Sequence, residues 1–284
     1  MTGLKRRQFL AGLGAAALAA GAGPASARPL DEVIERNRLR VAVYRDFPPY
    51  SYRKDGVLTG IDVDLAQAIA ERLGVRLDIF EHTAGETVSD DLRVAVWRGS
   101  LFGGEAADVM LHIPYDKRFG LMNPEAVLFA PYHREVFALL RDPERVPSAD
   151  LAELPDEPIG VEIDSIPDFF LLSVDGGRLR PHVLHFPTPE AAVEAFQRRE
   201  VAAVLAPRSN IEARLGDAAD GAPLTTVRLP GMMASSWDVG MATRENARDL
   251  TYAIGDVVAA MTEDGSLAAL FKRHGVVHRP IPVE

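Results

Sequence analysis

The sequence lacks cysteine, and it lacks any long run of like charges. Without cysteine, the 284-residue chain forms no disulfide and has no cysteine to carry a lipid anchor. A chain of this length can be stable through its hydrophobic core alone, because it buries most of its apolar surface on folding. Hydrophobic residues make up 47% of the chain and charged residues 25%, which suits one large or two modest globular domains.

Basic side chains are scarce relative to acidic ones. The formal net charge is -10, and a surface of that sign repels nucleic acid. The seven histidines are scattered, no metal ligands are clustered, and no Ser/His/Asp order is present. We therefore expect neither a metal nor another cofactor, and we expect a binding protein rather than an enzyme.

The first residues have the pattern of an export signal. The basic residues Lys5, Arg6 and Arg7 precede an apolar stretch that is too short and too rich in glycine to span a membrane. A small-residue cleavage pattern ends at Ala27, so residues 1–27 are predicted to be a cleaved signal peptide, which places the mature protein in the periplasm. The arginine pair resembles a twin-arginine signal, and a general secretory signal that carries two arginines is the alternative.

Strand and helix patterns alternate along the rest of the chain. A branched run at residues 39–43 predicts a buried strand, and residues 75–80 predict the next one. Between them, Asp62 is expected to cap a helix that ends at Gly74. Composition breaks near residue 143, and a second set of elements follows. The sequence therefore predicts an α/β fold of two lobes with a small-molecule cleft between them.

Four segments resemble one known family. They are residues 39–43, 47–52, 58–65 and 262–267, and they are similar to the family 3 extracellular solute-binding proteins of ABC importers. The resemblance spans about residues 38–276, with matches at both ends and a weaker middle. Members of that family bind mostly polar amino acids and trap them by closing two lobes about a hinge.

The resemblance implies the type II periplasmic binding protein fold, in which two α/β lobes are joined by a two-strand hinge. It also implies a monomer that delivers a small-molecule ligand to an ABC permease. Lobe one is expected to comprise residues 28–140 plus 243–284, and lobe two is expected to comprise residues 141–242 with the hinge strands. The crossing strands would include residues 136–141 and 239–243.

A motif of the family assigns one binding residue. In the family, an arginine after the third strand of lobe one binds the ligand carboxylate, and residues 116–118 resemble that motif, which gives the role to Arg118. A surface arginine on a polar loop is the alternative. The hydroxyl-rich loop that precedes this arginine in the family is absent here. His112 stands in its place, either as a donor to an anion or as a half-buried loop histidine.

The ammonium side of the family's site is altered. Tyr44 and Arg45 stand where an aspartate often follows the first strand, and Pro207 and Arg208 stand where a second aspartate usually follows a strand of lobe two. Both usual partners of an ammonium group are therefore missing, and a buried charge needs a partner. We expect an anionic ligand that bears carboxylates and no ammonium.

Other residues around these positions could also line the cleft. Asp46 or Asp164 could take over the role of the missing aspartates, and the ligand would then keep its ammonium. Phe47 matches the aromatic wall of the family's site. Trp237 precedes the second crossing strand and is expected to line the cleft. Ser165 stands at the start of a helix of lobe two, either as a plain N-cap or as a ligand contact.

A narrower resemblance concerns the middle of the chain. Residues 108–114 and 129–137 are similar to a subgroup that accompanies quinoprotein alcohol dehydrogenases. An accessory protein that handles the cofactor pyrroloquinoline quinone, a flat tricarboxylate, or that docks the dehydrogenase is therefore an alternative function. A cyclohexadienyl dehydratase-like enzyme is a further alternative, because such enzymes resemble the same fold. It would need a protonated carboxyl group in the cleft, for which Glu162 and Glu135 are candidates.

Overall fold

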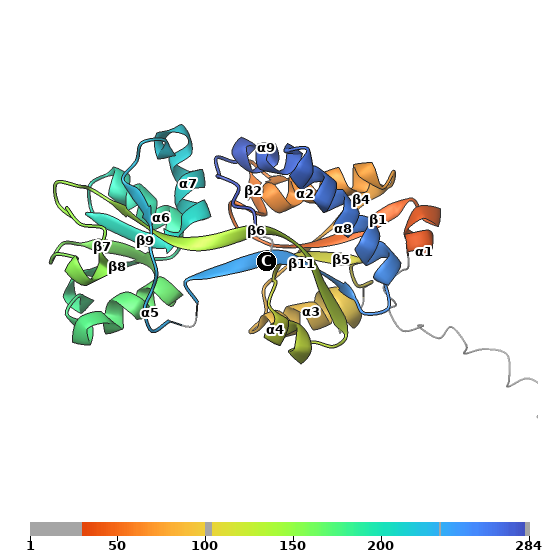
Figure 1. Cartoon of the computed structure of the whole chain (residues 1–284), viewed down its shortest axis with the longest axis horizontal. Coiled ribbons are helices and arrows are strands. Elements are labelled where there is room, and N and C mark those ends of the chain that lie inside the picture. The colour runs from red at the N-terminus through yellow and green to blue at the C-terminus, as the bar shows by residue number, and fades with distance from the viewer. Residues whose placement is uncertain (1–29, 100–103, 233, 282–284) are drawn as a thin grey trace, which may run out of the picture.

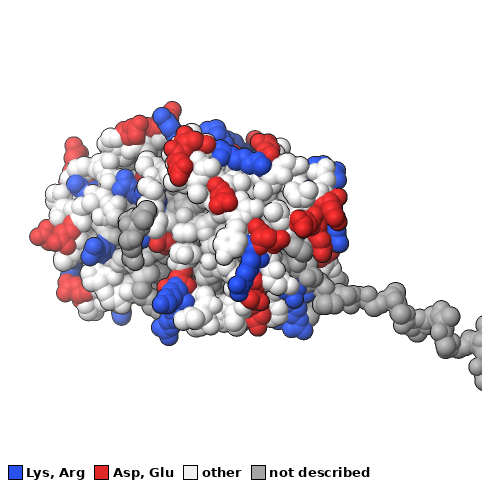
Figure 2. All heavy atoms as spheres, turned by 45° about the vertical axis from the view of Figure 1, so that its right-hand side comes forward, with Lys and Arg blue, Asp and Glu red and all other residues white. Residues whose placement is uncertain are grey.

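The computed structural model describes residues 30–99, 104–232 and 234–281, and Figure 1 shows them as two lobes joined by long strands. The predicted signal peptide lies outside the described residues. Within the described ranges, no helix is long and apolar enough to cross a membrane. Acidic and basic side chains are interspersed over the face drawn in Figure 2, so the net negative charge does not gather in one patch there.

Lobe one is a mixed sheet with helices on both faces (Figure 1). Its strands follow the order β4-β1-β5-β11-β6. Successive side chains of β1 point to opposite faces, so Val41 packs in the core beside α2, α8 and α9, whereas Ala42 packs beside α3 and η1. The elements are β1 (Arg38–Tyr44), the hairpin β2 (Tyr52–Lys54) and β3 (Val57–Thr59), β4 (Arg76–His82), β5 (Val109–Pro114), β6 (Ala126–Arg141), β11 (Ser236–Arg244), α1 (Leu30–Glu35), α2 (Ile61–Arg72), α3 (Val88–Leu92), the π-helix η1 (Arg93–Trp97), α4 (Lys117–Met122), α8 (Arg248–Glu263) and α9 (Ser266–Arg273).

Lobe two repeats this layering on a smaller scale. The end of β6 continues into the strand order β9-β7-β8, and β10 pairs with the other edge of β6. Leu139 of β6 packs with α5, whereas Leu140 packs with α6 and α7. The elements are β7 (Ile159–Glu162), β8 (Val183–Phe186), β9 (Ala203–Pro207), β10 (Leu224–Thr226), α5 (Ile166–Ser173), α6 (Pro189–Gln197), α7 (Arg208–Leu215) and the short helices η2 (Leu151–Glu153), η3 (Val174–Gly177), η4 (Arg180–His182) and η5 (Gly216–Ala219).

Strand β6 belongs to both lobes. Its residues up to Val136 pair with β11, and its residues from Phe137 onward pair with β9 of lobe two. Strand β11 pairs with β5 and β6 along its length. Residues 236–244 therefore pair within the sheet of lobe one, and they include the stretch 239–243 that the sequence analysis expected to be the second crossing strand.

Two bulges distort the sheet of lobe one beside Gly240. Between the pairs Ile113–Gly240 and Met110–Ala242, β5 has two residues where β11 has one, and His112 takes the left-handed conformation with a φ of 60°. β6 bulges on the other side of β11, where Ala130 has a φ of 44°. A side chain at position 240 would meet the Phe129 carbonyl oxygen at 2.9 Å, so the strand needs glycine there.

The helix α2 begins one residue before the predicted cap. Its N-cap is Gly60, whose φ is 132° and whose missing Cβ would lie 2.2 Å from the Tyr50 carbonyl oxygen. Only glycine fits this close approach. The prediction of Asp62 as the cap is therefore wrong, and Asp62 lies inside the first turn with its side chain buried.

The C-terminal segment ties the two lobes together. After α9 of lobe one, the amide of Val277 donates to Glu212 of α7 in lobe two. The Arg279 guanidinium then donates to both carboxylate oxygens of Glu212 at 3.1 and 3.0 Å and to the Ser209 hydroxyl at 2.8 Å. The backbone of Arg279 also pairs with Arg134 of β6. This segment forms a further connection between the lobes beside the crossing strands.

Candidate functional site

A hollow between the lobes gathers side chains from both of them. It has a volume of about 230 Å³. We call it the acidic hollow, and it is lined by Asp46, Phe47, Pro48, Tyr50 and His112 of lobe one, Glu135 and Trp237 of the crossing strands, and Glu162, Thr188, Pro189, Glu190, Pro207 and Asn210 of lobe two. The residues of lobe two come from the carboxyl ends of β7 and β9 and from the starts of α6 and α7, where ligands of open α/β sheets bind.

Four carboxylates line the acidic hollow, and no lysine or arginine is among its described lining residues. Glu190 accepts a hydrogen bond from the Asn210 amide at 2.9 Å. Burial and the charge of Glu190 raise the pKa of Glu162. Among the described residues, none donates a hydrogen bond to the side chain of Asp46 or Glu162. The hollow therefore has an excess of negative charge.

Glu135 differs from the other three carboxylates because it is already partnered. It is 2% exposed, and it accepts a hydrogen bond from the Tyr50 hydroxyl at 2.7 Å and another from the Ser209 amide at 3.3 Å. The Arg279 guanidinium lies 3.6 Å from it. The Tyr50 hydroxyl is held neutral there, since burial and the charge of Glu135 raise its pKa.

An aromatic wall covers the lobe-one side of the acidic hollow. The ring of Phe47, which is 38% exposed, stacks on Tyr50 with centroids 5.6 Å apart. His112 lies against both rings, with centroids 4.8 Å from Phe47 and 4.1 Å from Tyr50. Trp237 packs on Phe137 at 5.2 Å and also lines the hollow. The structure thus brings the predicted site residues Phe47, His112 and Trp237 together.

A second, wider hollow adjoins the first and shares Trp237 with it. Its volume is about 1030 Å³, and we call it the outer hollow. Arg118 lines it from the first turn of α4 and is exposed. Arg134 also lines it but makes a two-pronged ion pair with Asp238 at 2.7 and 2.9 Å. Arg118 has no ion pair with any residue that the structure describes, so it is the cation of the outer hollow that can meet a ligand.

Four predicted site residues lie outside both hollows. The hydroxyl of Tyr44 is buried and donates to Asp91 at 2.8 Å, so this side chain points into lobe one. Arg45 is exposed beside the cleft and lines neither hollow. Ser165 caps α5 by accepting from the Asp168 amide. Arg208 pairs with Glu212 at 2.6 Å, so it is turned away from the acidic hollow.

The acids of the hollow come mostly from positions that the sequence analysis did not assign to ligand binding. Asp46 was named as a substitute for the missing aspartates, and Glu135 and Glu162 were named only for an enzyme. Glu190 and Asn210 were missed. Both lie in the first turn of a helix that follows a strand of lobe two, and that position is the signal that could have identified them.

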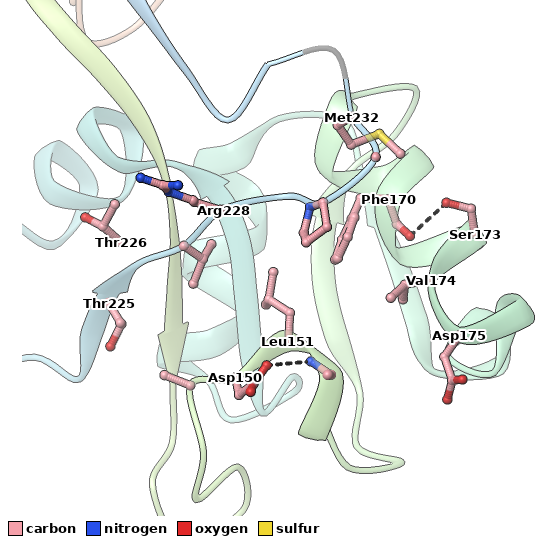
Figure 3. A pocket seen from close by; sticks show the side chains of 15 residues that line it. Asp150, Leu151, Phe170, Ser173, Val174, Asp175, Thr225, Thr226, Arg228 and Met232 are labelled. Carbon is pink, nitrogen blue, oxygen red and sulfur yellow. Dashed lines mark hydrogen bonds between the residues drawn. The ribbon is translucent and has the colours of Figure 1, made fainter.

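A third hollow lies within lobe two and has a different character (Figure 3). Its volume is about 620 Å³, and buried apolar side chains such as Leu151 and Phe170 form much of its wall. Asp150 accepts from the Ala152 amide at 2.9 Å, and Asp175 pairs with Arg178 at 3.1 Å. Its carboxylates are therefore already partnered. In the described part of the chain, no group of three or more His, Cys, Asp or Glu could hold a metal ion.

Comparison with known proteins identifies relatives of this chain. The family of bacterial extracellular solute-binding proteins, family 3, matches residues 39–93. The L-cystine-binding protein TcyJ of Escherichia coli strain K12 is 25% identical over 284 aligned residues, which cover 94% of this chain and 94% of the relative. Cyclohexadienyl dehydratase of Pseudomonas aeruginosa is 49% identical over 49 residues, which are 17% of this chain and 18% of that enzyme.

Solved structures show the same fold. The structure of an ancestral cationic amino acid solute binding protein superposes with a TM-score of 0.66 at 19% sequence identity, and the match covers 87% of this chain and 99% of that one. The two-lobed α/β architecture predicted from the sequence is therefore confirmed.

Proposed function

We propose that the chain is a family 3 bacterial extracellular solute-binding protein, and that it captures a small cationic solute, such as a basic amino acid, between its two lobes. The positive end of the solute lies in the acidic hollow. Its carboxylate, where it has one, meets Arg118 in the outer hollow. Closure of the lobes about β6 and β11 then traps it for an ABC permease.

The excess of carboxylates in the acidic hollow carries this proposal. Asp46, Glu162 and Glu190 have no cationic partner there among the described lining residues. Closing the lobes would remove water from these groups, and a buried charge without a partner is costly. An ammonium or guanidinium group of the solute supplies the missing charge. The name of the ancestral cationic amino acid binder, which shares the fold, agrees with a solute of this class.

The solute proposed here is positively charged, whereas the sequence analysis expected an anion without an ammonium. The hypothesis of an anion without an ammonium depended on the loss of two aspartates, at Tyr44 and at Pro207 and Arg208, and on Arg208 as a possible cation for the ligand. The Arg208 guanidinium pairs with Glu212 instead. Asp46, the alternative that was left open, lines the hollow instead. The carboxylate part of the hypothesis is kept, because Arg118 lines the adjoining hollow.

The same charge argument bears on the two alternative functions. Pyrroloquinoline quinone carries three carboxylates and would be repelled by the acidic hollow. This argument does not concern a dehydrogenase that docks outside the cleft, for which co-purification from the native host is the test. The dehydratase alternative gains from the raised pKa of Glu162, but its substrates prephenate and arogenate also carry carboxylates. Their turnover by the purified protein would establish an enzyme.

Isothermal titration calorimetry at pH 7.5 tests the proposed function. L-Arginine, L-lysine and agmatine are expected to bind, whereas L-glutamate and pyrroloquinoline quinone are not. L-Cystine belongs in the panel because a relative binds it. A protein that binds glutamate or the quinone more tightly than every cation would contradict the proposal.

A matched pair of variants on α6 localises the cation. Glu190→Gln removes a carboxylate of the hollow, and it should weaken L-arginine binding by about 30-fold, which corresponds to ~2 kcal/mol for a buried charge partner. Glu194→Gln removes a carboxylate of the same helix that pairs with Arg214 outside the hollow, and it should leave the affinity unchanged. Equal affinities of the two variants would remove Glu190 from the site.

A further inference from the structure

We propose that His112 and Asp62 form a proton-controlled hydrogen-bond acceptor in the wall of the acidic hollow, which holds a cationic ligand at neutral pH and releases it in acid. The inference rests on the proposed binding of a cation in that hollow. It adds a regulatory property that the excess of carboxylates alone does not supply.

Asp62 fixes the orientation and the tautomer of the histidine. Its carboxylate is fully buried, and one oxygen, Oδ1, accepts from the Tyr132 hydroxyl at 2.7 Å. The other, Oδ2, lies 3.3 Å from Nδ1 of His112, and neither of these two atoms has a hydrogen-bond partner among the described residues. A carboxylate only accepts hydrogen bonds, so a proton on Nδ1 is the arrangement that satisfies both atoms.

His112 is held in an unfavourable backbone conformation. His112 occupies the bulge of β5 with a φ of 60°, a conformation that a non-glycine residue adopts only at a cost. The bulge of β6 brings Tyr132 close enough for its hydroxyl to accept from the His112 amide at 3.2 Å while it donates to Asp62. Bulges next to binding sites re-aim a side chain, and the pair of bulges here aims His112 at Asp62 and at the hollow.

The second ring nitrogen of His112 is left for the ligand. Nε2 lies on the opposite edge of the ring from Nδ1, and none of the described residues bonds to it. The imidazole lies against the stacked rings of Phe47 and Tyr50, and His112 lines the acidic hollow. With Nδ1 protonated, a neutral imidazole presents an acceptor at Nε2, which suits an N–H of an ammonium or guanidinium group.

Protonation of His112 reverses this property. Nε2 then becomes a donor, and the ring gains a positive charge that repels the cation. Binding of the cation and binding of the proton therefore compete for the same nitrogen. The titratable groups around His112 are Asp62 of α2, Tyr132, His133 and Glu135 of β6, Asp46 and Tyr50 of the loop after β1, Glu162 of β7 and Glu190 of α6.

Calorimetry with L-arginine and agmatine between pH 5.5 and 8 tests the competition. As the pH falls through this range, the affinity for both ligands should weaken, by at most about tenfold per pH unit, because the cation competes with one proton. The carboxylates of the hollow also lose charge in acid, so His112→Gln serves as the control. Gln cannot titrate, and this variant should lose most of the pH dependence. At the acidic end of this range, measurements in two buffers of different ionisation enthalpy should show that the wild type releases more protons on binding than the variant does.

Two results would overturn the inference. One is L-arginine binding more tightly in acid while agmatine does not, because His112 would then meet the ligand carboxylate instead of the cation. The other is a pH dependence that is the same in wild type and His112→Gln. If neither cation binds at pH 7.5, the proposed function fails. The tautomer is still measurable in that case, because 15N NMR of the free wild-type protein should show an unprotonated Nε2, and a protonated Nε2 on a neutral ring would contradict the inference.

Discussion

Two groups of carboxylates lie at the junction of the lobes, and they differ in charge balance. Glu212 and Glu135 are each 2% exposed, and Arg279 lies within 3.6 Å of both, while Arg208 adds a second cation to Glu212. The acidic hollow holds Glu162 and Glu190 without any lysine or arginine among its described lining residues. The first group stabilises the junction, and the second is available to a ligand. Residue type does not separate the two groups, but charge balance does.

The largest expected effect is on stability, and it comes from removing the cation that compensates the buried carboxylates Glu212 and Glu135. Arg279→Met keeps the length of the side chain but leaves Glu212 and Glu135 buried with less compensation. It should lower the free energy of unfolding by about 3–5 kcal/mol, the usual cost of breaking a buried ion pair. Urea unfolding followed by circular dichroism measures this.

The control is an arginine of the same C-terminal region at the surface. Arg273 pairs with Asp64 at 3.0 Å with a side chain that is 60% exposed, so Arg273→Met should leave the unfolding midpoint nearly unchanged. Equal losses in the two variants would mean that burial of the carboxylates is not what makes Arg279 important.

Arg118 extends the comparison to cations. The guanidinium of Arg279 is occupied by Glu212, the Ser209 hydroxyl and a backbone carbonyl, whereas Arg118 has no ion pair among the described residues and lines the outer hollow. If Arg118 meets the buried ligand carboxylate, Arg118→Ala should weaken the binding of L-arginine by about 2–5 kcal/mol. The binding of agmatine, which has no carboxylate, should be weakened much less. An equal loss for both ligands, or no loss for either, would remove Arg118 from the carboxylate site.

The buried histidine of the junction allows a test by pH. The pKa of His133 is lowered to about 2, because burial and the nearby Arg279 guanidinium disfavour the imidazolium. Below pH 6.5 the unfolded chain therefore binds a proton that the folded chain does not, and stability is lost as the pH falls. Between pH 7 and 5 this group should cost about 2 kcal/mol.

His133→Gln should make the unfolding free energy less dependent on pH over that range, as urea titrations at pH 5, 6 and 7 would reveal. The His112→Gln variant of the acidic hollow is the matched comparison. If His133→Gln and His112→Gln reduce the pH dependence of the unfolding free energy equally, the buried histidine of the junction does not differ from the histidine of the acidic hollow in this respect.

Local patterns were enough to predict much of the fold. The runs at 39–43 and 75–80 became β1 and β4, and Thr188 caps α6 as its position before a proline indicates. The full length of β6 was not predicted, because Pro131 interrupts it at a bulge, a place where a strand tolerates proline. The pairing of β11 with lobe one also depends on contacts across the sheet that no local pattern contains.

The site was harder to predict because its charges are balanced by residues far away in the chain. Arg208 had no evident partner in the sequence, but in the structure it pairs with Glu212 one helical turn later. Glu212 also pairs with Arg279, which lies 67 residues after it in the chain. Tyr44 looked like a cleft residue, but its hydroxyl meets Asp91 in the core of lobe one. Three residues that line the cleft were easier to predict from the sequence, because each stands next to a strand end or in a crossing strand, where the backbone alone places it near the cleft. They are Phe47, His112 and Trp237.

The smallest expected effect concerns Arg208, and it tests the comparison most directly. Arg208→Ala removes one of two cations from Glu212 and leaves Arg279 at 3.0 Å. The side chain is 25% exposed, so stability should fall by only about 1 kcal/mol. The affinity for L-arginine should not change, because the guanidinium points away from the acidic hollow. A clear change of affinity without a loss of stability would instead restore Arg208 to the ligand site and make the junction and the hollow parts of one charge network.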